Sequence, residues 1–165
     1  LYVWRETAAQ IREWKQKLGI SVPVSVNVSR VDMYDPNLIK TFESLLREYG
    51  IRPDELLLEV TESAYTQDSQ QIIRTVENLR NLGFQVEMDD FGTGYSSLSY
   101  IQMLPFTMIK MDRSFIVQMD SDPVMEEIVS SVVRIAKAKG IHTIAEGVES
   151  KEQAGSNKDC HRCFV

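Results

Sequence analysis

Two adjacent aspartates, Asp89 and Asp90, close an apolar run in the segment EMDDFGTGYSSL, which covers residues 87–98. Aspartate and glycine are common turn residues, so a simple turn is one explanation for this segment. A metal site is the other, because one carboxylate of such a pair could bridge two cations while its neighbour holds the second. The choice depends on which other polar side chains the fold brings to the same place.

Other apolar runs also carry an ionisable or amide side chain toward their C-terminal end. These residues are Asn27 in VPVSVNVS, Glu59 and Glu62 in ELLLEVTE, Lys110 and Asp112 in TMIKMD, and Glu146 and Glu149 in HTIAEGVE. Asn27 alone could merely satisfy backbone groups, Glu62 could cap or anchor a loop, and Glu149 could belong to a solvated turn. Lys110, Glu59 and Asp89 are harder to explain in this way, because ionised groups within apolar runs need partners.

The order of predicted helices and strands indicates where the fold places these residues. Four amphipathic stretches end in a glycine that is typical of a helix C-terminus, namely Gly19, Gly50, Gly83 and Gly140. Asp35-Pro36 and Asp122-Pro123 each predict an N-cap followed by proline at the first helical position. Strands alternating with helices indicate an α/β fold with a parallel sheet. In a barrel or in a doubly wound sheet, the carboxyl ends of such strands face one cavity.

Several carboxylates gathered in one cavity repel each other unless cations neutralise them, and a single lysine is too little. Carboxylate and amide oxygens favour Mg²⁺ or Mn²⁺. No histidine is placed to favour zinc, since His142 precedes its strand and His161 lies in the tail. A pair of such ions stabilises the attacking and leaving oxygens in phosphoryl hydrolysis. The residues therefore predict a metal-dependent phosphoester hydrolase.

The amino-acid composition further limits the kinds of protein that this chain can be. The chain has 165 residues, of which 43% are hydrophobic and 25% charged, as expected for one globular domain or part of one. A net charge of −6 argues against DNA or RNA as a partner. The sequence shows neither a membrane-length apolar run nor a signal peptide, so a cytoplasmic domain is expected, whose parent protein could be membrane-anchored. Cys160 and Cys163 form one CxxC pair, which lacks the second ligand pair of a structural zinc site.

Five segments, in this order, closely resemble the EAL-domain family: VNVSR, LLLEVTES, DDFGTGYSSLSYI, LPFTMIKMDRSF and IAEGVES. The family consists of bacterial phosphodiesterases that hydrolyse cyclic di-GMP to linear pGpG. The resemblance therefore implies a TIM-like (β/α) barrel of the EAL type, cyclic di-GMP as substrate and two Mg²⁺ or Mn²⁺ ions as cofactors.

The resemblance also implies roles for individual residues. Asn27, Glu59 and Asp89 stand where the family binds its first metal ion, and Asp90 and Glu146 join Asp89 at the second. Lys110 stands where the family orients the attacking water, and Glu149 resembles the acid that supports this lysine. The loop that couples the metal site to the dimer interface matches Phe91, Gly92, Thr93 and Gly94, with Glu62 as its anchor. The substrate-binding residues are not assigned.

Two departures qualify the resemblance. The Glu-Ala-Leu strand that gives the family its name is absent, and AGSNKDCHRCFV at the other end resembles nothing in the family. We therefore expect residues 1–153 to form a partial EAL-type domain and residues 154–165 a divergent tail. Such an incomplete barrel has unpaired edges that favour association, so a homodimer is expected. Because a metal ligand is missing, the chain alone is expected to be weakly active or inactive, and restoring the missing strand should recover hydrolysis.

One alternative remains open beside the enzyme. Some members of the family have lost catalysis and bind cyclic di-GMP or a protein partner instead. A related possibility is a dimerisation platform inside a signalling protein that also carries sensory or cyclase domains. Degenerate members usually lack several metal ligands, whereas this sequence retains every internal one. Metal-dependent turnover separates the enzyme from both alternatives.

Overall fold

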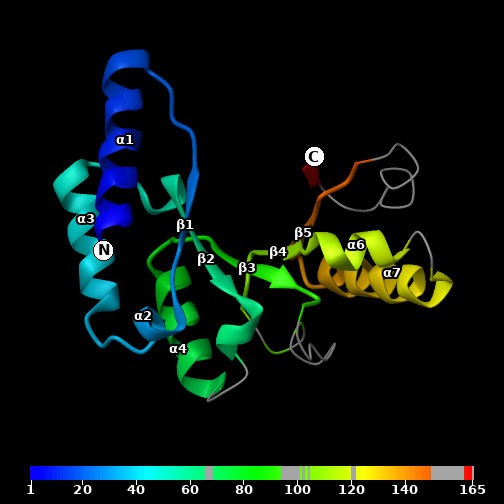
Figure 1. The fold of residues 1–165 in the computed structure, drawn as a ribbon. Coiled ribbons are helices and arrows are strands. Elements are labelled where there is room, and N and C mark those ends of the chain that lie inside the picture. The colour runs from blue at the N-terminus through cyan, green and yellow to red at the C-terminus, as the bar shows by residue number, and fades with distance from the viewer. Residues whose placement is uncertain are drawn as a thin grey trace. The chain divides into compact units, whose positions relative to one another are not determined.

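The computed structural model describes residues 1–65, 69–93, 101, 103, 105–119, 122–149 and 162–164 (Figure 1). The chain divides into two compact units. The first contains residues 1–60 and 67–86, and the second contains residues 61–66 and 87–165. Each unit is described by itself.

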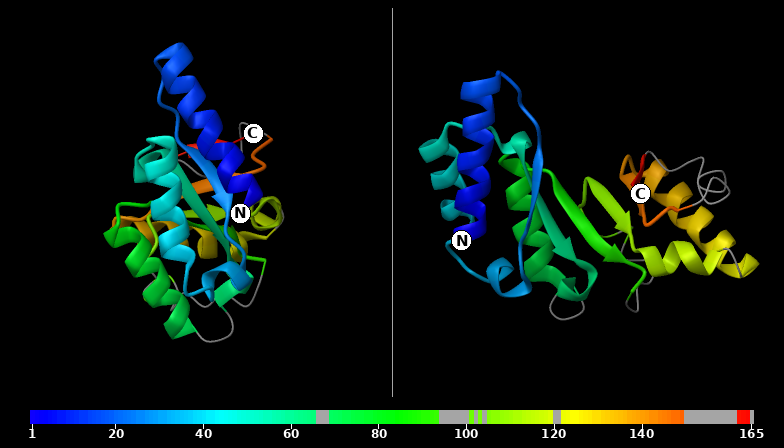
Figure 2. Two further views of the ribbon diagram at one scale, coloured as in Figure 1. Left: turned by 90° about the vertical axis from the view of Figure 1, so that its left-hand side faces the viewer. Right: turned by 45° about the horizontal axis from the view of Figure 1, so that its top comes forward.

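The first unit contains helices that cover a short parallel pair of strands. Its elements are α1 (Tyr2–Leu18), β1 (Val24–Asn27), α2 (Arg30–Met33), α3 (Leu38–Tyr49), the 3₁₀ turn η1 (Pro53–Glu55), β2 (Leu56–Thr61) up to Val60, and α4 (Ser69–Asn81). Strands β1 and β2 are parallel, and Asn27 lies opposite Glu59. Helices α1 and α3 lie side by side in both views of Figure 2.

Aromatic and aliphatic side chains at helical spacing form the core of the first unit. The Trp4 and Phe42 rings lie 4.6 Å apart between their centroids, and Phe42 lies 5.5 Å from Phe84. The Trp4 indole Nε1 also donates a hydrogen bond of 2.9 Å to the Asn27 carbonyl oxygen. Trp4 therefore packs α1 onto α3 and fixes the end of β1. The other side chains of the core include Ala8, Ile11, Leu38, Leu45, Ile72, Val76 and Leu79.

The second unit is built on parallel strands. Its elements are η2 (Glu62–Tyr65), β3 (Val86–Phe91) from Glu87 onward, β4 (Met108–Met111), α6 (Arg113–Met119), α7 (Pro123–Ala138), β5 (His142–Glu146) and β6 (Arg162–Phe164). Strand β4 pairs in parallel with β3 and β5, and β5 pairs in parallel with β6. The apolar face of α7 buries Val129, Val132, Val133 and Ala136. No helix in the described ranges is both long and apolar enough to cross a membrane.

Most of the predicted elements are confirmed. All five predicted strand segments form parallel strands, here β1 to β5. The four glycines at the predicted helix ends have positive φ angles, of 66° at Gly19, 62° at Gly50, 94° at Gly83 and 70° at Gly140. Asp122 caps α7 as predicted, because its side chain accepts a hydrogen bond from the Val124 N–H.

The predicted N-cap at Asp35 is wrong by two residues. The Asp35 carboxylate accepts a hydrogen bond of 2.8 Å from the Asn37 N–H, and α3 begins only at Leu38 with Asn37 as its N-cap. An aspartate that bonds the backbone two residues ahead forms a turn, which competes with capping. Strand β6 was not predicted, and it lies in the segment expected to be a divergent tail.

A buried carboxylate joins three segments of the first unit. Glu55, only 1% exposed, accepts a hydrogen bond of 2.8 Å from Lys15 Nζ and one of 2.7 Å from the Arg52 N–H, and it also contacts the Ser21 hydroxyl. Burial opposes ionisation of Glu55, yet the bonds from Arg52, Lys15 and Ser21 prevail and lower its pKa to about 2. The ionised Glu55 thus ties the end of α1 to the start of β2.

Glu55→Gln should lower the free energy of unfolding by about 2 kcal/mol at pH 7, because the amide loses the charge-assisted bonds. The folded pKa lies below the ordinary value of 4.5, so this stabilisation is complete above pH 4.5 and is lost as the pH falls toward about 2. Urea unfolding at several pH values measures the effect. Asp54→Asn, at an exposed neighbour, should change stability by less than about 0.5 kcal/mol. Equal losses in the two variants would contradict the role of Glu55.

Candidate functional site

A bulge in β3 carries the two adjacent aspartates. Met88 pairs with Ile109 of β4, and Phe91 pairs with Met111, so Asp89 and Asp90 together stand opposite the single residue Lys110. Asp90 has a φ of 57°, the only positive φ among the described residues that are not glycine. Neighbouring side chains on a regular strand point to opposite faces, and an extra residue breaks this alternation.

Lys110 joins two of the predicted site residues. Its ammonium Nζ lies 3.0 Å from Asp89 Oδ1 and 2.8 Å from Glu146 Oε1. The side chains of Lys110 and Asp89 are only 17% and 16% exposed, and that of Glu146 is 34% exposed. Because water screens such partly buried charges poorly, this group of three, here the Lys110 triplet, is held by strong electrostatic attraction.

The charges around the Lys110 triplet remain unbalanced. Burial is the largest cause that raises the pKa of Asp90, followed by repulsion from Asp89, Asp112 and Glu146, and Lys110 opposes the rise only in part. Asp112 stays ionised, because hydrogen bonds from the Ser114 hydroxyl and from backbone N–H groups lower its pKa. Asp90 therefore lies among charges that are mainly negative.

The chemistry of these side chains fits a divalent cation. Carboxylate oxygens are the ligands that Mg²⁺ and Mn²⁺ prefer, and burial together with neighbouring carboxylates raises the pKa of Asp90. Among the residues that the structure describes, no group of three His, Cys, Asp or Glu is spaced to hold a metal ion. Lys110 instead takes the place between Asp89 and Glu146. Metal binding at these residues therefore requires carboxylate oxygens to turn toward the ion.

Asn27 and Glu59 form a second pair of predicted ligands, within the first unit. They lie opposite each other on β1 and β2, and the Glu59 carbonyl accepts a hydrogen bond of 2.8 Å from the Val28 N–H. The Asn27 backbone is held in addition by Trp4. The exposed Asn27 and the half-buried Glu59 are thus paired at a fixed register on neighbouring strands.

Glu62 holds the start of the loop after β3. Its carboxylate, in a residue that is 5% exposed, accepts a hydrogen bond of 2.8 Å from the Gly92 N–H. Gly92 has a φ of 104°, and a Cβ atom there would lie 2.8 Å from the Phe115 ring, so a side chain does not fit. Phe91 packs edge-on against Phe115, and the Thr93 hydroxyl donates to the Asp90 carbonyl. Gly94 lies outside the described residues.

Glu149 lies against a residue that sequence reasoning did not single out. Its Oε1 is 2.7 Å from a guanidinium nitrogen of Arg113, the first residue of α6. Its predicted role beside Lys110 stays a prediction. Arg113 is a surface arginine after a strand, and nothing in the sequence separates it from other such arginines. In the CxxC segment, Cys160 and His161 lie outside the described residues, and Cys163 lies in β6.

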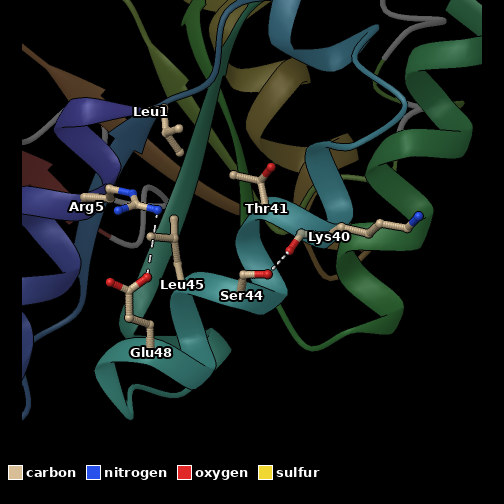
Figure 3. Close-up of a pocket in the computed structure, with 7 residues that line it drawn as sticks. All are labelled: Leu1, Arg5, Lys40, Thr41, Ser44, Leu45 and Glu48. Carbon is tan, nitrogen blue, oxygen red and sulfur yellow. Dashed lines mark hydrogen bonds and ion pairs between the residues drawn. The ribbon is translucent and has the colours of Figure 1, made fainter.

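A separate pocket opens between α1 and α3 of the first unit, with a volume of about 270 Å³ (Figure 3). Arg5 and Glu48 face each other across it with a distance of 3.9 Å between charged atoms, and the Ser44 hydroxyl bonds the Lys40 carbonyl. None of the predicted site residues lines this pocket. The residues that line it are a mixture of apolar and polar side chains, and they do not suggest a catalytic or metal-binding function.

Comparison with known proteins identifies relatives for this arrangement. The family model described as EAL domain matches residues 1–160. The cyclic di-GMP phosphodiesterase PdeR of Escherichia coli is 34% identical over 159 residues, which is 96% of this chain and 24% of that protein. The EAL domain of Mycobacterium smegmatis DcpA superposes with a TM-score of 0.86 at 35% identity, covering 98% of this chain and 74% of that one.

A further solved structure contains both a metal and a nucleotide. Klebsiella pneumoniae BlrP1, in a complex with manganese and cyclic di-GMP, matches with a TM-score of 0.80 at 28% identity over 94% of this chain and 40% of that one. The likeness to EAL domains confirms the predicted α/β fold of the TIM-like type. The chain spans only 18% to 24% of the length of three curated relatives.

Asp90→Asn should raise the free energy of unfolding by about 1 kcal/mol at pH 7 in the presence of EDTA, because it removes a buried charge among carboxylates. Asparagine also tolerates a positive φ. The folded pKa of Asp90 lies above the ordinary 3.8, so the gain should vanish below pH 3.8 and grow as the pH rises through the folded value.

Urea unfolding with EDTA and with Mn²⁺ measures this change. Mn²⁺ should stabilise the wild type more than Asp90→Asn, because ligand binding to the folded state stabilises it. Glu127→Gln, an exposed carboxylate of α7, serves as the matched control and should change neither result. A variant that is less stable than wild type in EDTA would show that Asp90 is not under electrostatic strain.

Proposed function

The chain belongs to the EAL domain family, and we propose that it is the catalytic part of a phosphodiesterase that hydrolyses cyclic di-GMP to linear pGpG with divalent metal ions. The Lys110 triplet beside the Asp89–Asp90 bulge is the observation that carries this proposal. The family likeness supports the substrate, since PdeR is named for the same activity.

The metal ligands are proposed separately for each unit. In the second unit they are Asp89 and Glu146, which contact Lys110, and Asp90, whose pKa is raised by burial and by neighbouring carboxylates. In the first unit they are Asn27 and Glu59, which offer an amide and a carboxylate oxygen at one register. The ions are proposed to be Mg²⁺ or Mn²⁺, and the manganese complex of BlrP1 supports this class of cation.

Divalent ions at such a site supply an activated water and neutralise charge on the phosphate. The protein's own part is positioning. Lys110 is held on two sides by carboxylates, so its ammonium group has a defined place from which it can orient the attacking water. Glu149 is proposed to support Lys110 and the metal ligands, as the family resemblance implies. A positive charge at Lys110 also lowers the cost of bringing an anionic substrate to an acidic protein.

The loop after β3 is proposed to link the site with its surroundings. Glu62 holds the Gly92 N–H, and Gly92 is two residues from Asp90. A shift of the loop at Phe91, Gly92, Thr93 or Gly94 would therefore pull on the bulge itself. This supports a role in coupling the site to a dimer interface, as the family resemblance implies.

Hydrolysis of cyclic di-GMP, followed as pGpG by chromatography with Mg²⁺ or Mn²⁺, tests the function directly. Asp89→Asn should lower the rate by more than about 100-fold, because even outer-shell partners of metal ligands are worth 10–100-fold. EDTA should abolish the reaction. Asp54→Asn, an exposed aspartate paired with Arg52, should leave the rate unchanged.

The outcomes separate the two functional classes. Metal-dependent product that disappears in Asp89→Asn supports the phosphodiesterase. Binding of cyclic di-GMP without product, even after the missing N-terminal strand is restored, would instead favour the module that only binds its ligand. The absence of both pGpG formation and cyclic di-GMP binding would overturn the proposal.

The proposed partners are a second copy of the chain and, in the longer protein, sensory or cyclase domains. The relatives are several times longer than this chain, which supports additional domains. Self-association is supported by exposed apolar side chains on two helices of the second unit. Val124 and Ile128, four residues apart on α7, are 65% and 39% exposed, and Val117 on α6 is 46% exposed.

Sedimentation velocity should show a dimer that the double variant Val124→Asp, Ile128→Asp shifts toward monomer, because charges on an apolar interface must be desolvated. Val31→Asp, at a valine of α2 that is 78% exposed, is the matched control and should keep the wild-type distribution. A dimer that persists equally in both variants would place the interface elsewhere.

A further inference from the structure

The side chain of Arg113 lies across Gly147, directly after β5. A Cβ atom at Gly147 would lie 2.5 Å from the Cγ of Arg113 and 2.8 Å from its Cβ, which is closer than real side chains approach. Gly147 also has a φ of 69°, a conformation that glycine adopts at little cost. The absence of a side chain at position 147 thus makes room for the stem of Arg113.

The guanidinium group of the same arginine reaches past Gly147 to Glu149, at 2.7 Å. Arg113 begins α6, two residues after the end of β4, whereas Glu149 stands three residues beyond Glu146. Arg113 therefore ties the segment that follows β4 to the segment that follows β5. The second of these segments, residues 147–149, is here called the β5 turn.

Two cationic side chains, Lys110 and Arg113, each form ion pairs with carboxylates near the ends of these strands. Lys110 pairs with Asp89 and Glu146, and Arg113 pairs with Glu149. Arg113 thus neutralises the Glu149 carboxylate, three residues beyond Glu146.

We propose that Arg113 is a positioning residue, which packs on Gly147 and pairs with Glu149 to hold the β5 turn, and thereby keeps the Glu146 carboxylate in place beside Lys110. When a divalent ion binds, the same restraint holds Glu146 as a ligand. This second part rests on the proposed function, whereas the restraint on the β5 turn does not.

A plain surface ion pair is the competing explanation. The charged ends of Arg113 and Glu149 are 61% and 62% exposed, and exposed pairs contribute little to stability. The packing on Gly147 distinguishes Arg113 from such a pair. The effect of Arg113 should accordingly appear in the order of the β5 turn and in metal affinity rather than in global stability.

Hydrogen exchange tests the restraint without any metal. Arg113→Ala removes both the stem and the charge, and should speed exchange of the amides at residues 147–149 at least fivefold. Arg113→Met keeps the stem and should give a smaller increase. Arg134→Ala is the matched control, because Arg134 pairs at 3.9 Å with Glu127 on the surface of α7, and it should leave this turn unchanged. Wild-type exchange in Arg113→Ala would overturn the proposal.

Mn²⁺ titration, followed by electron paramagnetic resonance, and steady-state kinetics test the consequence at the site. Arg113→Ala should weaken Mn²⁺ binding at least threefold, and Arg113→Met should lower kcat with an unchanged KM for cyclic di-GMP. A raised KM with normal Mn²⁺ affinity would mean that Arg113 contacts the substrate, and would overturn the positioning role.

These results remain separable from the proposed function. Faster exchange in Arg113→Ala together with a wild type that never forms pGpG would keep the restraint and reject the phosphodiesterase. Normal turnover by the wild type, with exchange and Mn²⁺ affinity unchanged in Arg113→Ala, would reject the positioning role and keep the phosphodiesterase.

Discussion

The contact of one ammonium group with two carboxylates is the interaction on which the rest of the site depends. Asp89 and Glu146 come from β3 and β5, and Lys110 lies between them on β4. Lys110 stands opposite the bulge of β3, and Glu146 lies two residues beyond Ile144, the partner of Lys110 on β5. Partial burial makes the attraction among the three residues strong. A neutral residue in place of Lys110 would leave two carboxylates facing each other, so the strand ends themselves would be less well defined.

Lys110 only partly neutralises its surroundings. Burial and neighbouring carboxylates raise the pKa of Asp90, and Asp112 is fixed in its ionised form by the first turn of α6. The charges that would serve the proposed metal site at the bulge therefore also destabilise the fold when no cation is bound. Charges that attract a cation repel each other when no cation is bound, which is a common feature of functional sites. Glu55 in the first unit shows the opposite case, a buried carboxylate whose partners fully compensate its charge.

Much of this organisation could be predicted from the sequence. Apolar runs and helix-ending glycines predicted β1 to β5 and the helices that end near Gly19, Gly50, Gly83 and Gly140, because periodicity and positive φ leave strong local signals. The clustering of Asp89, Lys110 and Glu146 followed from the position of each near the end of a parallel strand. Local signals misled at Asp35, where a turn and a helix cap demand the same residue type. They were silent at Arg113, whose proposed role depends on a contact with Gly147, a residue that follows β5.

The bulge at Asp89 and Asp90 makes the length of β3 as important as its composition. Met88 and Phe91 are both buried and paired with β4, so the number of residues between them is set by two fixed points. Deleting one residue from this interval would restore regular alternation, and at most one carboxylate would then remain on the face of Lys110. Insertions and deletions are tolerated mainly in loops. In this chain, a change of length inside β3 would therefore be more damaging than most substitutions of its apolar residues.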